Sequence, residues 1–181
     1  KGSLITAMEK PKTIHDFGGF PKSLFQVQYP APGSRSLAEE TQVTVAPTEL
    51  QLDETWGLDH GSWSLLKQMY PQADIPVVQL SLDYTRSPEQ HYEFAKQLAP
   101  LRKKGILIIG SGNIVHNLGR VVLQDGDFNQ PFGLDWALEA SAIFKKLINE
   151  GAHKELADYQ KLGGAVQLAV PTPEHYLPLL Y

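Results

Sequence analysis

Hydrophobic and polar residues follow one another along the chain in a pattern that predicts strands followed by helices. Apolar residues recur at helical spacing over 136–148, which predicts a long helix ending at Gly151. Two β-rich runs, 3–8 and 75–82, predict strands. The continuous apolar run 105–112 predicts a strand buried on both faces. This order indicates an α/β fold with a central, mostly parallel sheet flanked by helices.

Some segments carry residues that typically begin a helix. Ser87-Pro88-Glu89-Gln90 supplies a cap residue, a proline and a glutamine spaced as in a capping box. Ser62 is expected to cap a helix that runs to Tyr70, and Thr172 to cap a last helix that starts at Pro173. Shorter elements are expected as well: helices over 37–42 and 153–162, and strands over 43–45 and 49–52.

Composition narrows the class of protein. The chain has 181 residues, 42% apolar and 20% charged, which is typical of one globular domain, expected over residues 1–181. The formal net charge of −4 argues against nucleic acid and against an anionic membrane surface as partners. No apolar run approaches the ~18 residues of a membrane span. The absence of cysteine excludes disulfides and thiolate metal sites, and it fits a cytoplasmic protein.

The two ends of the sequence predict a piece of a longer polypeptide. The chain begins at Lys1 without a methionine, and it closes on the apolar residues 176–181, which are expected to pack against a further element. We therefore expect the domain to be incomplete at both ends. The sequence leaves the oligomeric state open.

Histidines are the main candidates for chemistry, because the chain has no H-E-x-x-H, no C-x-x-C and no phosphate-binding loop. His116 follows the apolar run 105–112, and ligands of α/β sheets bind beyond the carboxyl ends of strands. The alternative is a histidine that bonds a loop carbonyl. His175 is expected near the start of the last helix, where the helix dipole favours the neutral imidazole that a metal needs. The alternative is a hydrogen bond to solvent or to the cap.

His60 is the candidate for acid–base chemistry. It stands between Trp56 and Trp63 and directly follows Asp59, a carboxylate that we expect to orient its ring in a partly apolar pocket. The alternative is a turn histidine packed on tryptophan. The other histidines are expected to have no such role: His15 in a loop with its hydrogen bonds satisfied, and His91 and His153 in solvent. Four aromatic residues near the candidates either line a flat pocket or belong to the core: Phe17, Phe20, Trp56 and Trp63.

Several segments together resemble the class III extradiol ring-cleaving dioxygenases of the DOPA-dioxygenase type. The resemblance is carried by WGLDHGSW (56–63), MYPQADIPVVQLSL (69–82), SGNIVHN (111–117) and TPEHYLPLLY (172–181). TIHDFGGFP (13–21) is similar to an early loop of the same family. The resemblance extends over nearly the whole chain and rests on the combination of motifs.

The resemblance implies a single metal at the sheet edge, held by His116 and His175. Two more histidine ligands would come from G-H-G-S-P and A-H-W motifs, which this sequence lacks. In more distant relatives the position of His116 holds an acid–base histidine, so its role as ligand or catalyst stays open. The implied cofactor is one divalent metal, Fe²⁺ for oxygenase activity or Zn²⁺ as purified, and the implied partners are a catechol and O2. For such a reaction we expect His60 to be the acid–base residue that accepts a phenolic proton and later returns one. A zinc hydrolase using the same histidines and a non-catalytic metal-binding domain are the alternatives.

Overall fold

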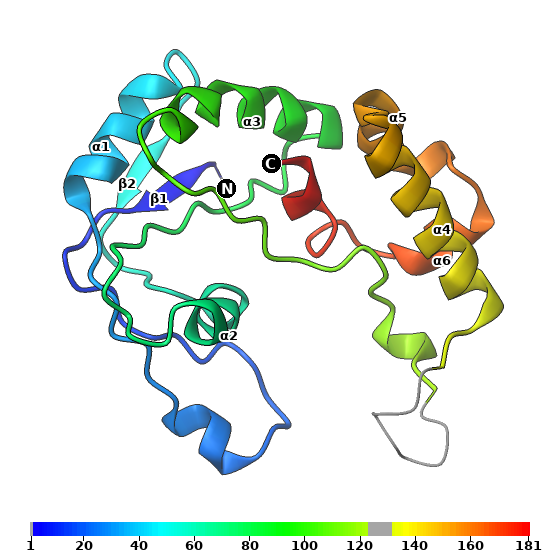
Figure 1. Cartoon of the computed structure of the whole chain (residues 1–181), viewed down its shortest axis with the longest axis horizontal. Helices are drawn as coiled ribbons and strands as arrows, with labels where there is room; N and C mark the ends of the chain where they lie inside the picture. Colours follow the sequence, from blue (N-terminus) through cyan, green and yellow to red (C-terminus); the bar gives the residue numbers. More distant parts are fainter. Residues whose placement is uncertain (1, 123–131) are drawn as a thin grey trace. The chain divides into compact units, whose positions relative to one another are not determined.

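The computed structural model describes residues 2–122 and 132–181 (Figure 1). The chain divides into two compact units, the first made of Lys1–Thr85 with Lys96–Ser111 and the second of Arg86–Ala95 with Gly112–Tyr181. A parallel sheet together with helices confirms the predicted α/β class. The single domain over 1–181 stays a prediction.

The first unit contains the parallel sheet. Strand β1 (Leu4–Thr6) pairs with β2 (Gln51–Asp53). This confirms the strand predicted at 3–8 in shortened form and the strand predicted at 49–52 with its bounds moved toward the C-terminus. Helix α1 (Arg35–Thr44) packs against both strands, beside the blue and cyan arrows of Figure 1. Along the other edge of β1, the segment 77–81 makes only an isolated antiparallel bridge. The run predicted as a strand over 75–82 therefore follows the sheet without forming a regular strand.

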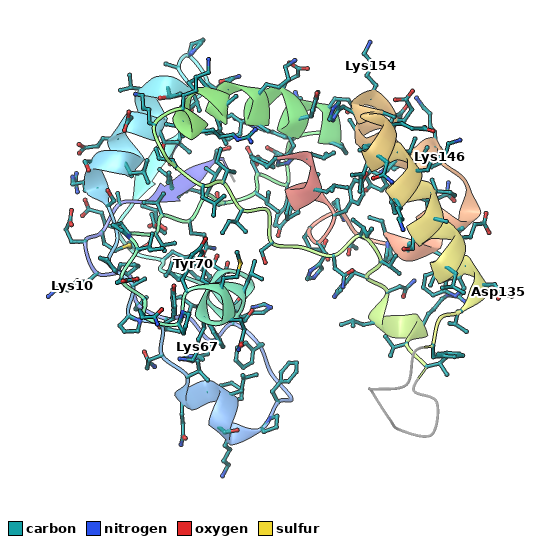
Figure 2. All side chains as sticks on the ribbon, in the orientation of Figure 1. Lys10, Lys67, Tyr70, Asp135, Lys146 and Lys154 are labelled. Carbon is teal, nitrogen blue, oxygen red and sulfur yellow. The ribbon has the colours of Figure 1, made fainter. Side chains whose placement is uncertain are left out.

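Helix α2 (His60–Met69) is held by its buried face. Trp63 and Leu66 point into a hydrophobic cluster whose other buried members are Tyr29, Ala31, Leu58 and Ala73. Tyr70, labelled in Figure 2, follows the helix and accepts a hydrogen bond at its carbonyl from the Tyr29 hydroxyl. The predicted cap was wrong by three residues: the side chain of Asp59 accepts from the Ser62 amide at 3.2 Å. Ser62 uses its hydroxyl on Gln79 instead.

Helix α3 (Pro88–Arg102) begins with the predicted capping box. The Ser87 amide donates to the Gln90 side-chain oxygen at 2.8 Å, and the Gln90 amide donates to the Ser87 hydroxyl at 3.3 Å. These two bonds satisfy helix-start amides that have no partner within the helix. Four consecutive residues thus define the start of α3.

Two further predicted strands are wrong. Residues 105–112 are not in a strand, and Leu107 is 63% exposed although the sequence predicts it to be buried. An apolar run becomes a strand only when a neighbouring strand accepts its hydrogen bonds, and the described residues pair none with it. Residues 43–45 lie at the end of α1, because the Ser34 hydroxyl caps that helix early and its hydrogen bonds continue to Val45.

The second unit is helical. Helix α4 (Asp135–Glu150) ends at Gly151, whose positive φ of 64° closes the helix as predicted. It packs against α5 (His153–Ala157) and α6 (Gly164–Ala169), and its Asp135 start and outward-pointing Lys146 are labelled in Figure 2. The described residues also form four short 3-10 helices: η1 (Lys22–Gln26), η2 (Leu118–Arg120), η4 (Tyr159–Lys161) and η5 (Leu177–Leu180). Among the described helices, none is long and apolar enough to cross a membrane.

Candidate functional site

The second unit brings His116 and His175 together. Their ring centroids lie 3.5 Å apart with an interplanar angle of 28°, so the two imidazoles are stacked. Both residues are half-buried. Two nitrogen-bearing rings from distant parts of the sequence therefore share one location in this unit.

His175 lies in a turn and not in the helix expected there. The amides of Tyr176 and Leu177 both donate to the Pro173 carbonyl at 2.9 Å, and the chain then enters the short helix η5. Pro178 has no amide proton, so it cannot donate to the Glu174 carbonyl as an α-helix would require. The predicted helix cap at Thr172 was therefore wrong, and the helix-dipole argument for His175 does not apply.

The neighbouring residue Tyr176 anchors this turn in the core of the unit. Its side chain is fully buried, with ring centroids 5.1 Å from Phe144 and 4.4 Å from Tyr159. Its hydroxyl donates to the Leu156 carbonyl at 2.7 Å. Burial raises the pKa of Tyr176 well above its usual value, so the hydroxyl stays protonated and keeps donating.

The loop carrying His116 is tied to the same turn through its backbone. The Asn113 amide donates to the His175 carbonyl at 2.6 Å, and the His116 amide donates to the Ala169 carbonyl at 2.8 Å. Gly112 leaves room for this approach, because a Cβ at that position would lie 2.3 Å from the same His175 carbonyl oxygen. The close packing of loop and turn holds the backbones of both histidines next to each other.

Glu174 adds a carboxylate beside the ring pair. Burial alone would raise its pKa, but the Thr172 hydroxyl, which donates to it at 2.5 Å, and the nearby His175 and His116 rings hold the pKa of Glu174 below its usual value. The carboxylate is thus ionised at neutral pH and contributes negative charge next to the imidazoles.

The donor set of this location fits part of a metal site. Imidazole nitrogens are ligands of both zinc and iron, and the ring pair supplies two of them. Within residues 2–122 and 132–181, no three His, Cys, Asp or Glu side chains gather where they could hold one ion. His116 and His175 thus bring two imidazoles of the kind that bind a metal to one location.

His60 lies in the first unit and takes a different carboxylate from the one predicted. Its Nδ1 lies 2.8 Å from Oδ1 of Asp16, and its backbone amide donates to the same oxygen at 3.0 Å. Asp59 is occupied elsewhere, by the Ser62 amide and by the Gln79 side-chain amide. The expectation that Asp59 orients His60 was therefore wrong. Asp16 was missed because it lies 44 residues away, although it belongs to the 13–21 motif.

The aromatic residues near the candidates divide between core and surface. Trp63 is buried, and its indole nitrogen donates to the Ile14 carbonyl at 2.8 Å, so it belongs to the core. The Phe17 ring contacts the His60 ring edge-to-face, with centroids 5.6 Å apart, and also contacts Phe20, which is 57% exposed. Trp56 is exposed.

The other histidines have structural surroundings. Nε2 of His15 bonds the Val27 carbonyl at 2.9 Å, as expected of a satisfied loop histidine. His153 is exposed as predicted and stacks on Tyr92. The prediction for His91 was wrong: it is fully buried, and its Nδ1 lies 2.9 Å from the Tyr181 hydroxyl.

Comparison with known proteins identifies the family of the chain. Residues 2–177 match the model described as the catalytic LigB subunit of aromatic ring-opening dioxygenase. The chain belongs to the LigB family. This confirms the resemblance to extradiol dioxygenases that the sequence motifs indicate.

Named relatives and a solved structure agree with membership of the LigB family. The chain is 48% identical to 4,5-DOPA dioxygenase extradiol of Escherichia coli (strain K12), with 100% of this chain and 66% of that protein covered. It is 39% identical to the Beta vulgaris protein of the same name, covering 97% of this chain and 65% of that one. A crystal structure of an uncharacterised E. coli K12 protein matches with a TM-score of 0.78 and 38% identity, over 100% of this chain and 68% of that chain. The chain thus spans about two thirds of the length of these relatives.

Proposed function

We propose that the protein is a metal-dependent extradiol dioxygenase that inserts both atoms of O2 into the ring of a DOPA-like catechol and yields a ring-opened semialdehyde. The observation that carries the proposal is the contact of the His116 and His175 rings, in a chain of the LigB family. Relatives named 4,5-DOPA dioxygenase extradiol support the choice of a catechol.

His116 and His175 are proposed as ligands of one divalent metal, Fe²⁺ for oxygenase activity and Zn²⁺ as an alternative occupant. When bound, such an ion supplies Lewis acidity and a template on which the two catechol oxygens and O2 can be held together. Two imidazoles leave at least two positions of a four-coordinate ion unfilled. Water, the substrate or further protein ligands would fill these positions.

His60 is proposed as the acid–base residue. Its Nδ1 is bound to Asp16, which leaves Nε2 to accept a proton from a phenolic hydroxyl and to return one later. His116 is also a candidate for this role. Its removal distinguishes the two roles, because a metal ligand and an acid–base residue give different results when they are replaced. Replacing a ligand lowers the metal affinity, whereas replacing an acid–base residue lowers only the reaction rate.

The test measures O2 uptake and metal content on the same preparations. Iron-loaded protein is expected to consume O2 with L-DOPA and with simpler catechols and to form a coloured ring-opened product. H175A is expected to bind Zn²⁺ about 10–100-fold more weakly or worse, which titration calorimetry measures independently of activity. H116A is expected to behave the same way if His116 is a ligand, and to keep metal while losing rate if it is the acid–base residue.

H153A is the matched control, because His153 is exposed and stacks on Tyr92 in an unrelated part of the same unit. It is expected to keep both metal and O2 uptake. Hydrolysis of an ester by the zinc form, without O2 uptake by the iron form, would refute the dioxygenase proposal and favour a hydrolase.

A further inference from the structure

We propose that Asp16 is a positioning residue that fixes the tautomer and orientation of His60. The inference rests on the proposed acid–base role of His60 and deepens it. The carboxylate comes from a loop far from His60 in sequence, and no comparison assigns it a role.

A single oxygen of Asp16 holds His60 at two points. Oδ1 accepts from the His60 backbone amide at 3.0 Å and faces Nδ1 of the ring at 2.8 Å. An ionised carboxylate only accepts hydrogen bonds, so Nδ1 must carry the proton of the neutral ring and Nε2 must carry the lone pair. Because backbone and ring share one acceptor, rotation of the ring would break one of the two bonds.

The position of His60 in the fold explains why the carboxylate binds there. His60 is the first residue of α2, and its backbone amide is among those that have no partner within the helix. The positive end of the helix dipole favours an anion at this place. Asp16 therefore satisfies a helix-start amide and holds the ring with the same atom.

The surroundings keep Asp16 ionised and the ring confined. Burial alone would raise the pKa of Asp16, but the two hydrogen bonds from His60, together with the backbone amide of Asp16 and the charge interaction with His60, hold the pKa below its usual value. Phe17, the next residue in the same loop, contacts the His60 ring edge-to-face at an interplanar angle of 81°. One loop thus provides both the acceptor and the packing.

The experiment reads the tautomer directly. In protein with ¹⁵N-labelled histidine, long-range ¹H–¹⁵N spectra distinguish a protonated Nδ1 from a protonated Nε2, and the His60 signals are assigned by their loss in H60Q. Wild-type protein is expected to show the Nδ1–H form. D16A is expected to shift His60 toward the mixed tautomers of a free imidazole, and to lower kcat at least about 10²-fold with little change in KM. D16N, which keeps the size of the side chain, is expected to lower kcat by a smaller factor.

Asp59 supplies the matched control. It precedes His60 directly, but its carboxylate binds Ser62 and Gln79, and in D59N an oxygen remains to accept from the Ser62 amide. D59N is expected to leave the His60 tautomer and kcat unchanged. Circular dichroism and the urea midpoint of each variant show whether the fold is kept.

Each outcome bears on one proposal. An unchanged Nδ1–H signal in D16A overturns the positioning role, whether or not the variant loses activity. A shifted tautomer in D16A with wild-type kcat keeps the positioning role and overturns the expected effect of Asp16 on the rate. Wild-type kcat in H60Q would refute the acid–base role of His60 instead, and the spectra would still decide whether Asp16 sets the ring.

Discussion

Replacing Gly112 by alanine tests whether the packing of the Gly112–Asn113 backbone against the His175 carbonyl positions His175. The added Cβ would lie 2.3 Å from the His175 carbonyl oxygen and 3.1 Å from the Pro178 ring. Both neighbours are rigid, since one is a backbone atom and the other a proline ring in the adjoining turn. The loop and the turn must therefore separate, because no flexible side chain is available to yield.

The size of the displacement follows from the structure. Cβ contacts below 3.0 Å essentially never occur, so the two segments must separate by about 0.7 Å. The Asn113 amide, which donates to the same carbonyl at 2.6 Å, would lose much of this hydrogen bond. Ligand distances in metal sites are usually kept within about 0.2 Å, so such a shift is large for a ligand. Overpacking of this kind typically costs about 1–3 kcal/mol of stability.

Zn²⁺ titration calorimetry and urea unfolding are the assays for G112A. We expect Zn²⁺ affinity to fall about 10–100-fold, as when the support of a ligand is lost, together with a lower urea midpoint. G164A is the control from the same unit, because an added Cβ there meets nothing within 4 Å at the start of α6. It is expected to keep the affinity and to raise the midpoint slightly, since alanine restricts the unfolded chain.

One result would refute this reasoning. If G112A binds Zn²⁺ as tightly as wild type and unfolds at the same urea concentration, the approach of Gly112 to His175 does not support the ring pair. If the midpoint falls but the affinity does not, the contact stabilises the unit without positioning His175 as a ligand.

Two further predictions concern stability. Burial alone would raise the pKa of Asp53, but hydrogen bonds from the Thr55 hydroxyl and amide hold the pKa below its usual value. The ionised carboxylate therefore stabilises the fold at pH values above its unfolded pKa of about 3.9, and this stabilisation is lost as the pH falls through the folded pKa. D53N should therefore lower the urea midpoint at about pH 7, and its difference from wild type should shrink as the pH falls below about 3.9. A difference that stays the same below that pH would contradict the prediction. Y176F should lower the free energy of unfolding by about 1–3 kcal/mol, because the buried Leu156 carbonyl loses its donor, and an unchanged midpoint would show that another donor replaces it.

Helix positions were predictable where the signal is local. The capping box of α3 lies within four consecutive residues, and Gly151 ends α4 by its own backbone conformation. The strands were less predictable because a strand needs a partner from elsewhere. The run 105–112 has the composition of a buried strand, yet Leu107 is exposed where no described strand pairs with it.

The histidine pair was indicated by motifs and not by the elements assigned to them. His175 is in a turn because Pro178 stops the helix predicted from Pro173, and His116 follows a segment that is not a strand. The motifs nevertheless identified two residues whose rings are stacked. Two sequence motifs can therefore identify side chains that lie together even where the local structure predicted for them is wrong, provided that other contacts fix the backbone.

The choice of carboxylate for His60 shows why a neighbour in sequence is a poor guide here. Asp59 is the N-cap of α2, and an N-cap side chain turns toward the amides of the first helical turn. Its oxygen is thereby committed to Ser62, which lies along the helix, while the side chain of His60 at the first helical position points away from the axis. An acceptor for that ring must then come from a different segment. The His60 amide, which has no partner within the helix, favours an anion at the same place. Asp16 meets both requirements with one oxygen. Where a carboxylate caps a helix that begins with a histidine, the partner of the histidine ring is therefore better sought in another loop than in the capping residue.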